Sequence, residues 1–370
     1  MIAFKSKILK TASLVFLLFL TILAPLKSYS NSTENRQLYD SAFNEIRLML
    51  EDSIPADFKR AVFLTENAYF DDALDYLKYC NLIDYYAALI NSFLRANPIT
   101  YDKEDYQNVA INSAIFHFMT DTIFLSKDSV LHYPYKYDFD DFDGSNDWSS
   151  MFVTNLLQTQ TGNCHSMPFL YKILADELGA KAYLSLAPYH MYIKSYCERS
   201  GWYNTELTSA MFPVDAWISA SGYVQLEAIK SGIYMDTLSN KQSIAFCLFD
   251  LAKGYEKQYG FKNNSFIFDC LDLALEYYPN FVNAMIYKAE SLKKRFDAHL
   301  ILNDANDFKE ILHLEIPNQI YTEMEGLYTQ VIKYGYREMP EEMYNEWFNS
   351  LKNGTDKYQN KQILHIFQNQ

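Results

Sequence analysis

Residues 161–179 read TGNCHSMPFLYKILADELG and precede three short β-type segments: KAYLSLA (181–187), HMYIKSY (190–196) and WYNTELT (202–208). In the first stretch, apolar residues recur at three- and four-residue spacing, which predicts a helix that begins at Cys164 and ends at Gly179, a natural C-cap. Pro188 separates the first two β-type segments, as expected between strands. A helix followed by strands predicts an α+β unit.

The chain on both sides of this unit has a helical pattern. Before it, apolar residues are spaced by three and four, as in Tyr39, Phe43, Ile46 and Leu50. Residues 137–148, YDFDDFDGSNDW, are acidic and aromatic and are interpreted as a loop. The predicted organisation has four parts: a signal peptide (1–30), a helical N-terminal unit (31–135), the α+β core (136–240) and a second helical unit (241–370).

The second helical unit contains a pattern of paired helices. LALEYYPN (273–280) is followed by AMIYKA (284–289), which resembles the junction between tetratricopeptide repeats, where a small residue lets two helices approach and Pro closes the turn. The match covers one junction. It predicts helical hairpins, with further amphipathic helix over 321–332 and 341–351.

The first thirty residues are typical of a secretory signal. Lys5, Lys7 and Lys10 precede an apolar run over 12–26, and small side chains follow at Ser28 and Ser30. The alternative is an uncleaved membrane anchor, but this run is shorter than the ~20 residues that a spanning helix needs. We therefore expect an exported protein, periplasmic or extracellular, with no membrane association after cleavage.

Composition limits the classes of partner. The 370 residues are 49% hydrophobic, with only 11 Gly and 10 Pro, which excludes a disordered or collagen-like chain and indicates two or three domains. The formal net charge is −14. Nucleic-acid binding needs clustered basic residues, so we expect no nucleic-acid partner.

Five cysteines are present, an odd number that leaves at least one outside any internal disulfide. Cys80, Cys197, Cys247 and Cys270 have no distinctive setting and are either paired or small buried side chains. Cys164 differs because it follows Thr161-Gly162-Asn163 and opens a helix, where unpaired backbone N–H groups favour a thiolate. Gly162 is expected to let the backbone bend sharply before the cysteine. A thiolate is the form that attacks a carbonyl carbon.

A base for this nucleophile is available downstream. His190 begins the second β-type segment, from which its ring can face the helix N-terminus. In the third segment Asn204 and Glu206 alternate with other residues and so lie on one face of the strand. Either side chain is a candidate to orient the imidazole.

Together these residues carry a resemblance. Gly162-Asn163-Cys164, the helix ending at Gly179, His190 on a strand and Trp202-x-x-x-Glu206 on the next resemble the core of the transglutaminase-like superfamily, in the bacterial branch that joins this core to tetratricopeptide-like helices. The resemblance covers about residues 150–215. It implies papain-like Cys-His-Asp chemistry, with Cys164 as nucleophile and His190 as base. Glu206 aligns with the acid, where Asp is usual, and Asn204 is the alternative.

Other residues near Cys164 have less defined roles. The backbone N–H of Cys164 is the natural oxyanion donor, and Gln158 is a candidate for a second. His165 points away from its neighbour on a helix and is expected to line the cleft or cap the helix. A zinc site would need four ligands at close spacing, so we expect neither a metal nor a cofactor. Cleft-lining aromatic candidates, with the core as the alternative, are Tyr171, Tyr189, Tyr192, Trp202 and Trp217.

The sequence thus predicts an exported cysteine peptidase, amidase or acyltransferase that hydrolyses a peptide or isopeptide bond in a peptide or protein substrate. The alternative is a catalytically inactive domain of the same fold that serves as a scaffold, with a protein partner bound by the tetratricopeptide-like helices. The resemblance implies the reaction chemistry and leaves the substrate open.

Overall fold

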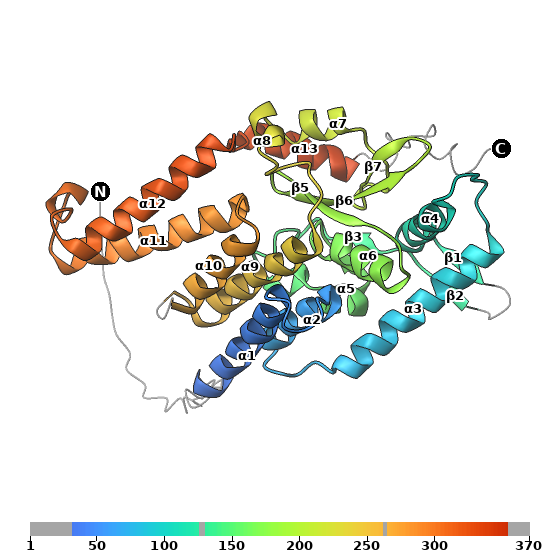
Figure 1. Ribbon diagram of the computed structural model, residues 1–370, viewed down its shortest axis with the longest axis horizontal. Helices are drawn as coiled ribbons and strands as arrows, with labels where there is room; N and C mark the ends of the chain where they lie inside the picture. Colours follow the sequence, from blue (N-terminus) through green and yellow to red (C-terminus); the bar gives the residue numbers. More distant parts are fainter. Residues whose placement is uncertain (1–31, 126–129, 262–264, 354–370) are drawn as a thin grey trace, which may run out of the picture.

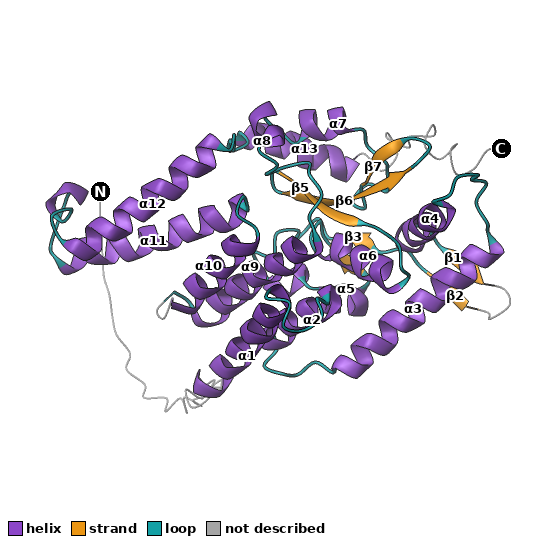
Figure 2. Cartoon of the chain, in the orientation of Figure 1, coloured by secondary structure: helices purple, strands orange, loops and turns teal. Residues whose placement is uncertain are grey.

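A computed structural model describes residues 32–125, 130–261 and 265–353. Helices form most of this part of the chain, and the described strands form three small sheets (Figure 2). The protein is therefore an α+β structure dominated by helix, and the expected class is correct at that level. The predicted signal peptide lies outside the described residues. None of the described helices is both long enough and apolar enough to span a membrane.

Four helices open the described chain: α1 (Ser32–Leu50), α2 (Phe58–Tyr69), α3 (Tyr76–Ala96) and α4 (Tyr106–Thr120). Aspartates fix the starts of two of them. Asp57 accepts the backbone N–H of Arg60 at 2.9 Å and caps α2, and Asp75 accepts the N–H of Lys78 at 3.1 Å and caps α3. The helical pattern in this region therefore reflects real helices with defined N-termini.

The prediction of a helical unit over 31–135 is wrong near its end. Strands β1 (Ile123–Leu125) and β2 (Val130–His132) form an antiparallel hairpin there. The backbone turns from helical to extended at Asp121, which ends α4. Ile123 and Val130 are β-branched and fit a pleated ribbon better than a further turn of helix.

The central sheet is antiparallel, with β5 (Tyr183–Ala187), β6 (His190–Cys197) and β7 (Gly201–Thr205) in that order. Ala187 pairs with His190, so residues 188 and 189 alone form the turn. Helix α6 (Ser166–Glu177) packs against β5 and β6 and is also contacted by α3 and α4. Gly179 follows it with φ of +73°, as expected for a residue that ends a helix.

Several short elements surround α6 that the sequence pattern did not indicate. The 3-10 helix η2 (Trp148–Met151) and α5 (Val153–Thr159) precede it, and β3 (Lys136–Tyr137) pairs in parallel with β4 (Thr161–Gly162). Two short helices, α7 (Asp215–Ser221) and α8 (Leu226–Lys230), follow the sheet. The β3–β4 pair matters most for the site, because it brings the acidic aromatic loop beside Cys164.

The second half of the chain forms helical pairs (Figure 1). Helix α9 (Asn240–Tyr259) packs on α10 (Ser265–Tyr277), and α11 (Val282–Leu302) packs on α12 (Glu315–Lys333). The 3-10 helix η3 (Phe308–Glu310) lies between α11 and α12, and α13 (Glu341–Asn353) closes the described chain. The expected hairpins are present.

The core crosses the boundaries predicted from sequence. Helices α1 and α2 pack against α9, although α9 lies far along the chain. One continuous cluster of buried apolar side chains extends from Tyr39 of α1 through Leu170 of α6 to Val331 of α12. Both helical regions therefore support the central unit directly.

Candidate active site

Cys164 lies in the short turn between β4 and α6, and the first turn of α6 is held by its neighbour Asn163. The Oδ1 atom of Asn163 accepts the backbone N–H groups of His165 and Ser166, each at 3.0 Å. In return, the Oγ of Ser166 accepts the N–H of Asn163 at 3.1 Å. Asn163 is therefore the N-cap of α6. This cap fixes Cys164 at the positive end of the helix dipole.

Gly162 has a role different from the expected sharp bend. It lies in β4, and its φ is not in the left-handed region. A Cβ at this position would lie 2.6 Å from Ser166 Oγ and 2.7 Å from Leu156 Cδ1. Leu156 is fully buried, so neither neighbour has space to move. The Gly is needed because α5 and α6 approach the backbone of β4 closely.

His190 lies between Cys164 and Glu206. Its Nε2 atom is in close hydrogen-bond contact with Oε2 of Glu206, and its ring is near enough to the Cys164 thiol to lower the pKa of that thiol. Because Nε2 is committed to Glu206, Nδ1 is the ring nitrogen that remains for the thiol. The three side chains form a continuous series in the order Cys164, His190, Glu206.

The charges of these three groups support one another. Burial disfavours the charged ring, yet the Glu206 carboxylate and the Cys164 thiol raise the pKa of His190 to about 10. Burial raises the pKa of Cys164, but its hydrogen bond with His190 and the charge of that ring outweigh burial and leave the pKa lowered. The pKa of Glu206 is also lowered, because His190 outweighs burial. The site therefore favours a thiolate beside an imidazolium.

Glu206 is itself held in place. It follows β7 directly, is 3% exposed, and its Oε1 accepts the backbone N–H of Thr208 at 2.8 Å. Its backbone pairs with Met211 in an isolated bridge. A carboxylate in this position can fix the orientation of the imidazole while its second oxygen remains satisfied.

Asn204 and Gln158 are placed differently from Glu206. The amide of Asn204 donates to the Pro213 carbonyl at 2.9 Å and to Oδ1 of Asp215 at 2.8 Å. It therefore ties β7 to the start of α7, and the side chain that contacts His190 is Glu206. Gln158 is exposed on α5. The structure gives it no contact with Cys164.

Two tyrosines that flank Cys164 complete its surroundings. The β3–β4 pairing places Tyr137 opposite Gly162, and the hydroxyl of Tyr137 is within hydrogen-bond reach of the Cys164 side chain. On the other side, the Cys164 thiol lies 3.9 Å from the carbonyl oxygen of Tyr189. Tyr189 has φ of +55°, a strained value for a tyrosine that the two-residue β5–β6 turn imposes.

The remaining aromatic candidates divide between core and surface. Tyr171 and Tyr192 are almost fully buried and belong to the hydrophobic core. Trp202 is half-exposed on the sheet and makes edge-to-face contacts with Tyr183 and Tyr196. Trp217 lines a small cavity together with His190 and Glu206. Of these candidates, Tyr189 and Trp217 lie close to the candidate catalytic groups, and Tyr192 stacks on the His190 ring from the core, with ring centroids 6.5 Å apart.

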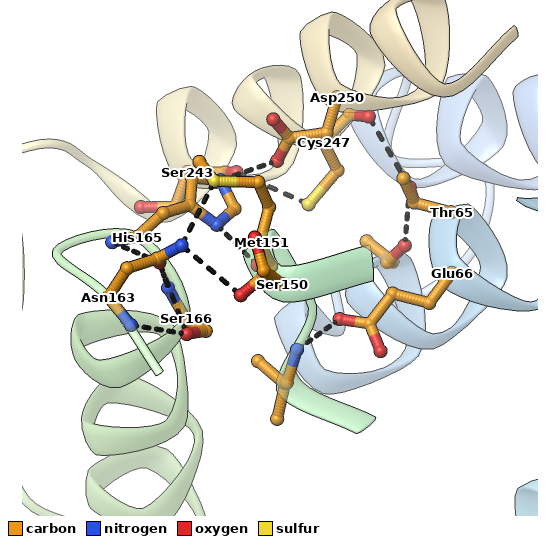
Figure 3. Close-up of polar contacts among 12 residues, drawn as sticks. Thr65, Glu66, Ser150, Met151, Asn163, His165, Ser166, Ser243, Cys247 and Asp250 are labelled. Carbon is orange, nitrogen blue, oxygen red and sulfur yellow. Dashed lines mark hydrogen bonds and ion pairs between the residues drawn. The ribbon is translucent and has the colours of Figure 1, made fainter. Parts of the chain in front are cut away.

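His165 anchors the cysteine turn to the helical hairpins (Figure 3). Its Nδ1 bonds the Met151 carbonyl and its Nε2 bonds Oδ2 of Asp250 on α9, both at 2.9 Å. Burial alone lowers the pKa of His165, but the Asp250 carboxylate outweighs it and raises the pKa. The side chain is 8% exposed, so it supports the turn from behind and does not line the cleft.

Glu66 of α2 supports the same region from another direction (Figure 3). Its two carboxylate oxygens accept the N–H groups of Val153 and Thr154 at 2.7 and 2.9 Å and so cap α5. Burial raises the pKa of Glu66 to about 7, against the opposing effect of these hydrogen bonds. Helix α2 thereby holds the segment that precedes Cys164, and α9 holds the turn itself through His165.

Sequence reasoning missed Asn163 as a cap, Tyr137 as a neighbour of the sulfur, and Asp250 as the partner of His165. A signal existed for the first, because Asn163 precedes the helix and Ser166 follows it three positions later. Tyr137 and Asp250 are brought to the site by long-range packing, for which a single sequence carries no local signal.

A cavity of about 600 Å³ lies beside the β5–β6 turn. It is lined by Pro188 and Tyr189 and by side chains of α9, α11 and α12. This volume falls within the range of pockets that bind small ligands or side chains. The cavity therefore offers space for a small ligand or a side chain next to Tyr189.

The five cysteines are unpaired, and Cys164 differs from the buried ones. Burial raises the pKa of Cys247 and of Cys270 well above the ordinary value, whereas the pKa of Cys164 is lowered. Among the described residues, no group of three or more His, Cys, Asp or Glu side chains is arranged to hold a metal ion. The distinctive chemistry of the described chain is that of a thiol.

Comparisons with known proteins leave the family open. No family model matches the chain, and no curated protein matches it. A solved structure that aligns with it is described as the crystal structure of menin that reveals the binding site for Mixed Lineage Leukemia (MLL) protein. The alignment covers 86% of this chain and 88% of that chain, at 11% identity and a TM-score of 0.33. A likeness this low supports no argument about fold or function.

Proposed function

We propose that the chain is a cysteine-dependent acyl-transfer enzyme with a transglutaminase-like core, and that it hydrolyses a peptide or isopeptide bond. The observation that carries this proposal is the position of His190, in contact with Glu206 on one side and within reach of Cys164 on the other. Cys164 lies just before α6, His190 begins β6 and Glu206 directly follows β7. This order agrees with the arrangement that the resemblance implies.

In the first half of the reaction, the Cys164 thiolate attacks the carbonyl carbon of the substrate and forms a C–S bond. The carbonyl oxygen becomes an oxyanion, for which the backbone N–H of Cys164 is a donor. This N–H has no hydrogen-bond partner in the described part of the chain. When the C–N bond breaks, His190 gives its proton to the departing amine, and a thioester remains on Cys164.

In the second half, His190 takes a proton from water as the water oxygen attacks the thioester carbonyl. The C–S bond breaks, the acid product leaves, and the thiolate and imidazolium are restored. Glu206 keeps the ring oriented and stabilises its positive charge through both halves. An amine in place of water would complete a transfer reaction, for which the same residues suffice.

A direct experiment is labelling with a peptide that carries an electrophile. The unmodified chain should gain one covalent adduct, mapped by mass spectrometry to Cys164. Cys164→Ala should gain none, and His190→Ala should gain it at least about tenfold more slowly, because the thiol loses the group that lowers its pKa. Equal labelling of all three proteins would contradict the proposal.

A non-catalytic scaffold is the second candidate, and one observation favours it. The described C-terminal helix places Tyr344 beside Cys164 and Tyr189, so the site is partly covered by the chain itself. In that function, the helical pairs α9–α10 and α11–α12 would present their surface to a protein partner. Slow and uniform alkylation of Cys164 and Cys80 would favour the scaffold.

We also propose that the protein is exported. The support is the basic start followed by the apolar run over 12–26. Fractionation of cells that express the full chain should place the mature protein in the periplasm or the medium, with a new N-terminus near residue 30. Recovery of the uncleaved chain in the cytosol would contradict this proposal.

A further inference from the structure

Three aromatic side chains are called here the aromatic patch because each contacts a ring of α13: Phe139, Phe142 and Tyr189. The β3–β4 pair brings the loop with Phe139 and Phe142 to this place, because the N–H of Asp138 donates to the carbonyl of Gly162 at 2.7 Å. Tyr189 is 53% exposed, and its carbonyl contacts the Cys164 thiol. The patch is therefore continuous with the approach to the sulfur.

Helix α13 covers this patch with two side chains one helical turn apart. The ring centroids of Phe348 and Phe142 are 4.4 Å apart, and those of Phe348 and Phe139 are 5.8 Å apart. Tyr344 lies 5.6 Å from Tyr189 and 6.3 Å from Phe142, also between centroids. Residues four apart share a helix face, so α13 presents one aromatic edge to the patch.

The same helix lies close to the reacting sulfur. Burial raises the pKa of Tyr344, and the negative charge of Cys164 raises it further. The pKa of Tyr137 is also raised, first by burial and then by the charge of Cys164, and Tyr344 raises it further. Tyr344 contacts the ring of Tyr189, whose carbonyl oxygen lies 3.9 Å from the Cys164 sulfur, so a substrate that reaches the sulfur across the patch meets Tyr344.

Ring contacts between α13 and the patch are made by Tyr344 and Phe348. In the described residues, α13 lacks the close backbone packing that joins α11 to α12. Tyr344 and Phe348 are themselves only half-buried. An element held by a few rings can leave its place at a modest free-energy cost, in contrast to one that is part of the core.

We propose that α13 is an intramolecular competitor of the substrate: Tyr344 and Phe348 occupy the aromatic patch, and a peptide substrate displaces them by placing an aromatic side chain there. This inference rests on the proposed function of Cys164 and adds to it a substrate class and a form of autoinhibition. The preference for an aromatic substrate side chain is supported by the contacts in the structure, because the patch consists of aromatic rings and the side chains that now cover it are also aromatic. Offset and edge-to-face pairs of this kind are favourable with any aromatic residue.

The test compares a small thiol reagent with a large one. Cys164 is partly exposed, so iodoacetamide should alkylate it at a similar rate in the unmodified chain and in Y344A/F348A. A maleimide on a long polyethylene glycol chain should react with Cys164 about tenfold faster in Y344A/F348A, because the helix no longer restricts access. N345A/N349A is the matched control, since both residues are exposed on the same helix and should leave both rates unchanged.

The ratio of the maleimide rate to the iodoacetamide rate tests the competitor role of α13, and it does so whether or not Cys164 is a thiolate. A ratio that stays the same in Y344A/F348A overturns the competitor role, even if iodoacetamide reacts rapidly. Slow reaction with iodoacetamide in every variant contradicts the proposed function instead, and a raised ratio would still show that α13 blocks the site. Circular dichroism of each variant should match the unmodified chain, and a chain that ends at residue 340 provides a second opened form with the same expected ratio.

The substrate class has its own readout. In Y344A/F348A, a tripeptide chloromethyl ketone with Phe next to the electrophile should alkylate Cys164 about tenfold faster than the same reagent with Ala. In the unmodified chain the two reagents should differ less, because α13 fills the patch. Equal rates in the opened variant would overturn the aromatic preference.

Discussion

His165 and Asp250 are 85 residues apart in sequence, and their Nε2 and Oδ2 atoms are 2.9 Å apart in the buried interior. The first residue follows the candidate nucleophile and the second belongs to α9. The pair therefore links the cysteine turn to the helical hairpins. Its consequence is that the hairpins contribute to the geometry of the site, beyond any surface that they offer to partners.

Replacement of Asp250 should destabilise the protein strongly. Asp250→Ala leaves His165 without its buried partner, and we expect the free energy of unfolding to fall by about 3 kcal/mol or more. Lys293→Ala breaks an exposed ion pair with Asp297 and should cost less than about 1 kcal/mol. Urea denaturation of both variants measures the difference. Equal, small losses would show that the His165–Asp250 contact is unimportant.

The same pair predicts a pH dependence of stability. The pKa of His165 is raised in the folded protein, so its contribution is fully present below its unfolded value of about 6.5 and is lost as pH rises through the folded value. The free energy of unfolding, measured from pH 5 to pH 9, should therefore fall more steeply in the unmodified chain than in His165→Gln. Parallel curves would contradict this expectation.

Glu206 and Asn204 should have separable effects. Glu206→Gln keeps the shape of the side chain but removes the charge that raises the pKa of His190, so alkylation of Cys164 at pH 7 should slow by about tenfold. Asn204→Ala breaks hydrogen bonds to Pro213 and Asp215 and should lower stability, with little change in the alkylation rate. The opposite pattern would assign the orienting role to Asn204.

Gly162 should tolerate no side chain. A methyl group there meets Ser166 and Leu156, and we expect Gly162→Ala to reduce the free energy of unfolding by about 1–3 kcal/mol. Gly326, in helix α12, has open space around its would-be Cβ, so Gly326→Ala should stabilise the chain by about 0.5–1 kcal/mol. Thermal and urea unfolding of the two variants provide the comparison. A neutral Gly162→Ala would show that α5 and α6 can separate at β4.

Much of the fold was predictable from local pattern. The helix after Cys164 and the strands on both sides of Pro188 follow from apolar spacing and turn residues, which are properties of neighbouring positions. Strand β1 was not predicted, because three residues are too few to show a period. The β3–β4 pair joins residues 136–137 to 161–162, and no local signal specifies such a pairing.

Some residues of the candidate site were likewise predictable from local sequence, and others were not. Cys164 and His190 stand out because a thiol at a helix start and an imidazole at a strand start have a recognisable chemistry. The choice between Asn204 and Glu206 needed coordinates, since both lie on one face of the strand region and only the register of β7 decides which one reaches the ring. Tyr344 could not be found from sequence, because its contact with the site depends on where the last described helix packs.

The central claim is that His190 and Glu206 keep Cys164 as a thiolate, and site-resolved alkylation by iodoacetamide tests it most directly. Between pH 5 and pH 9, with the adducts quantified by mass spectrometry, Cys164 of the unmodified chain should react at least about tenfold faster than Cys80 at pH 7, because its pKa is lowered. His190→Ala should shift the rise in the Cys164 rate to higher pH and remove the difference. Equal, slow rates for Cys164 and Cys80, unchanged in His190→Ala, would contradict the claim.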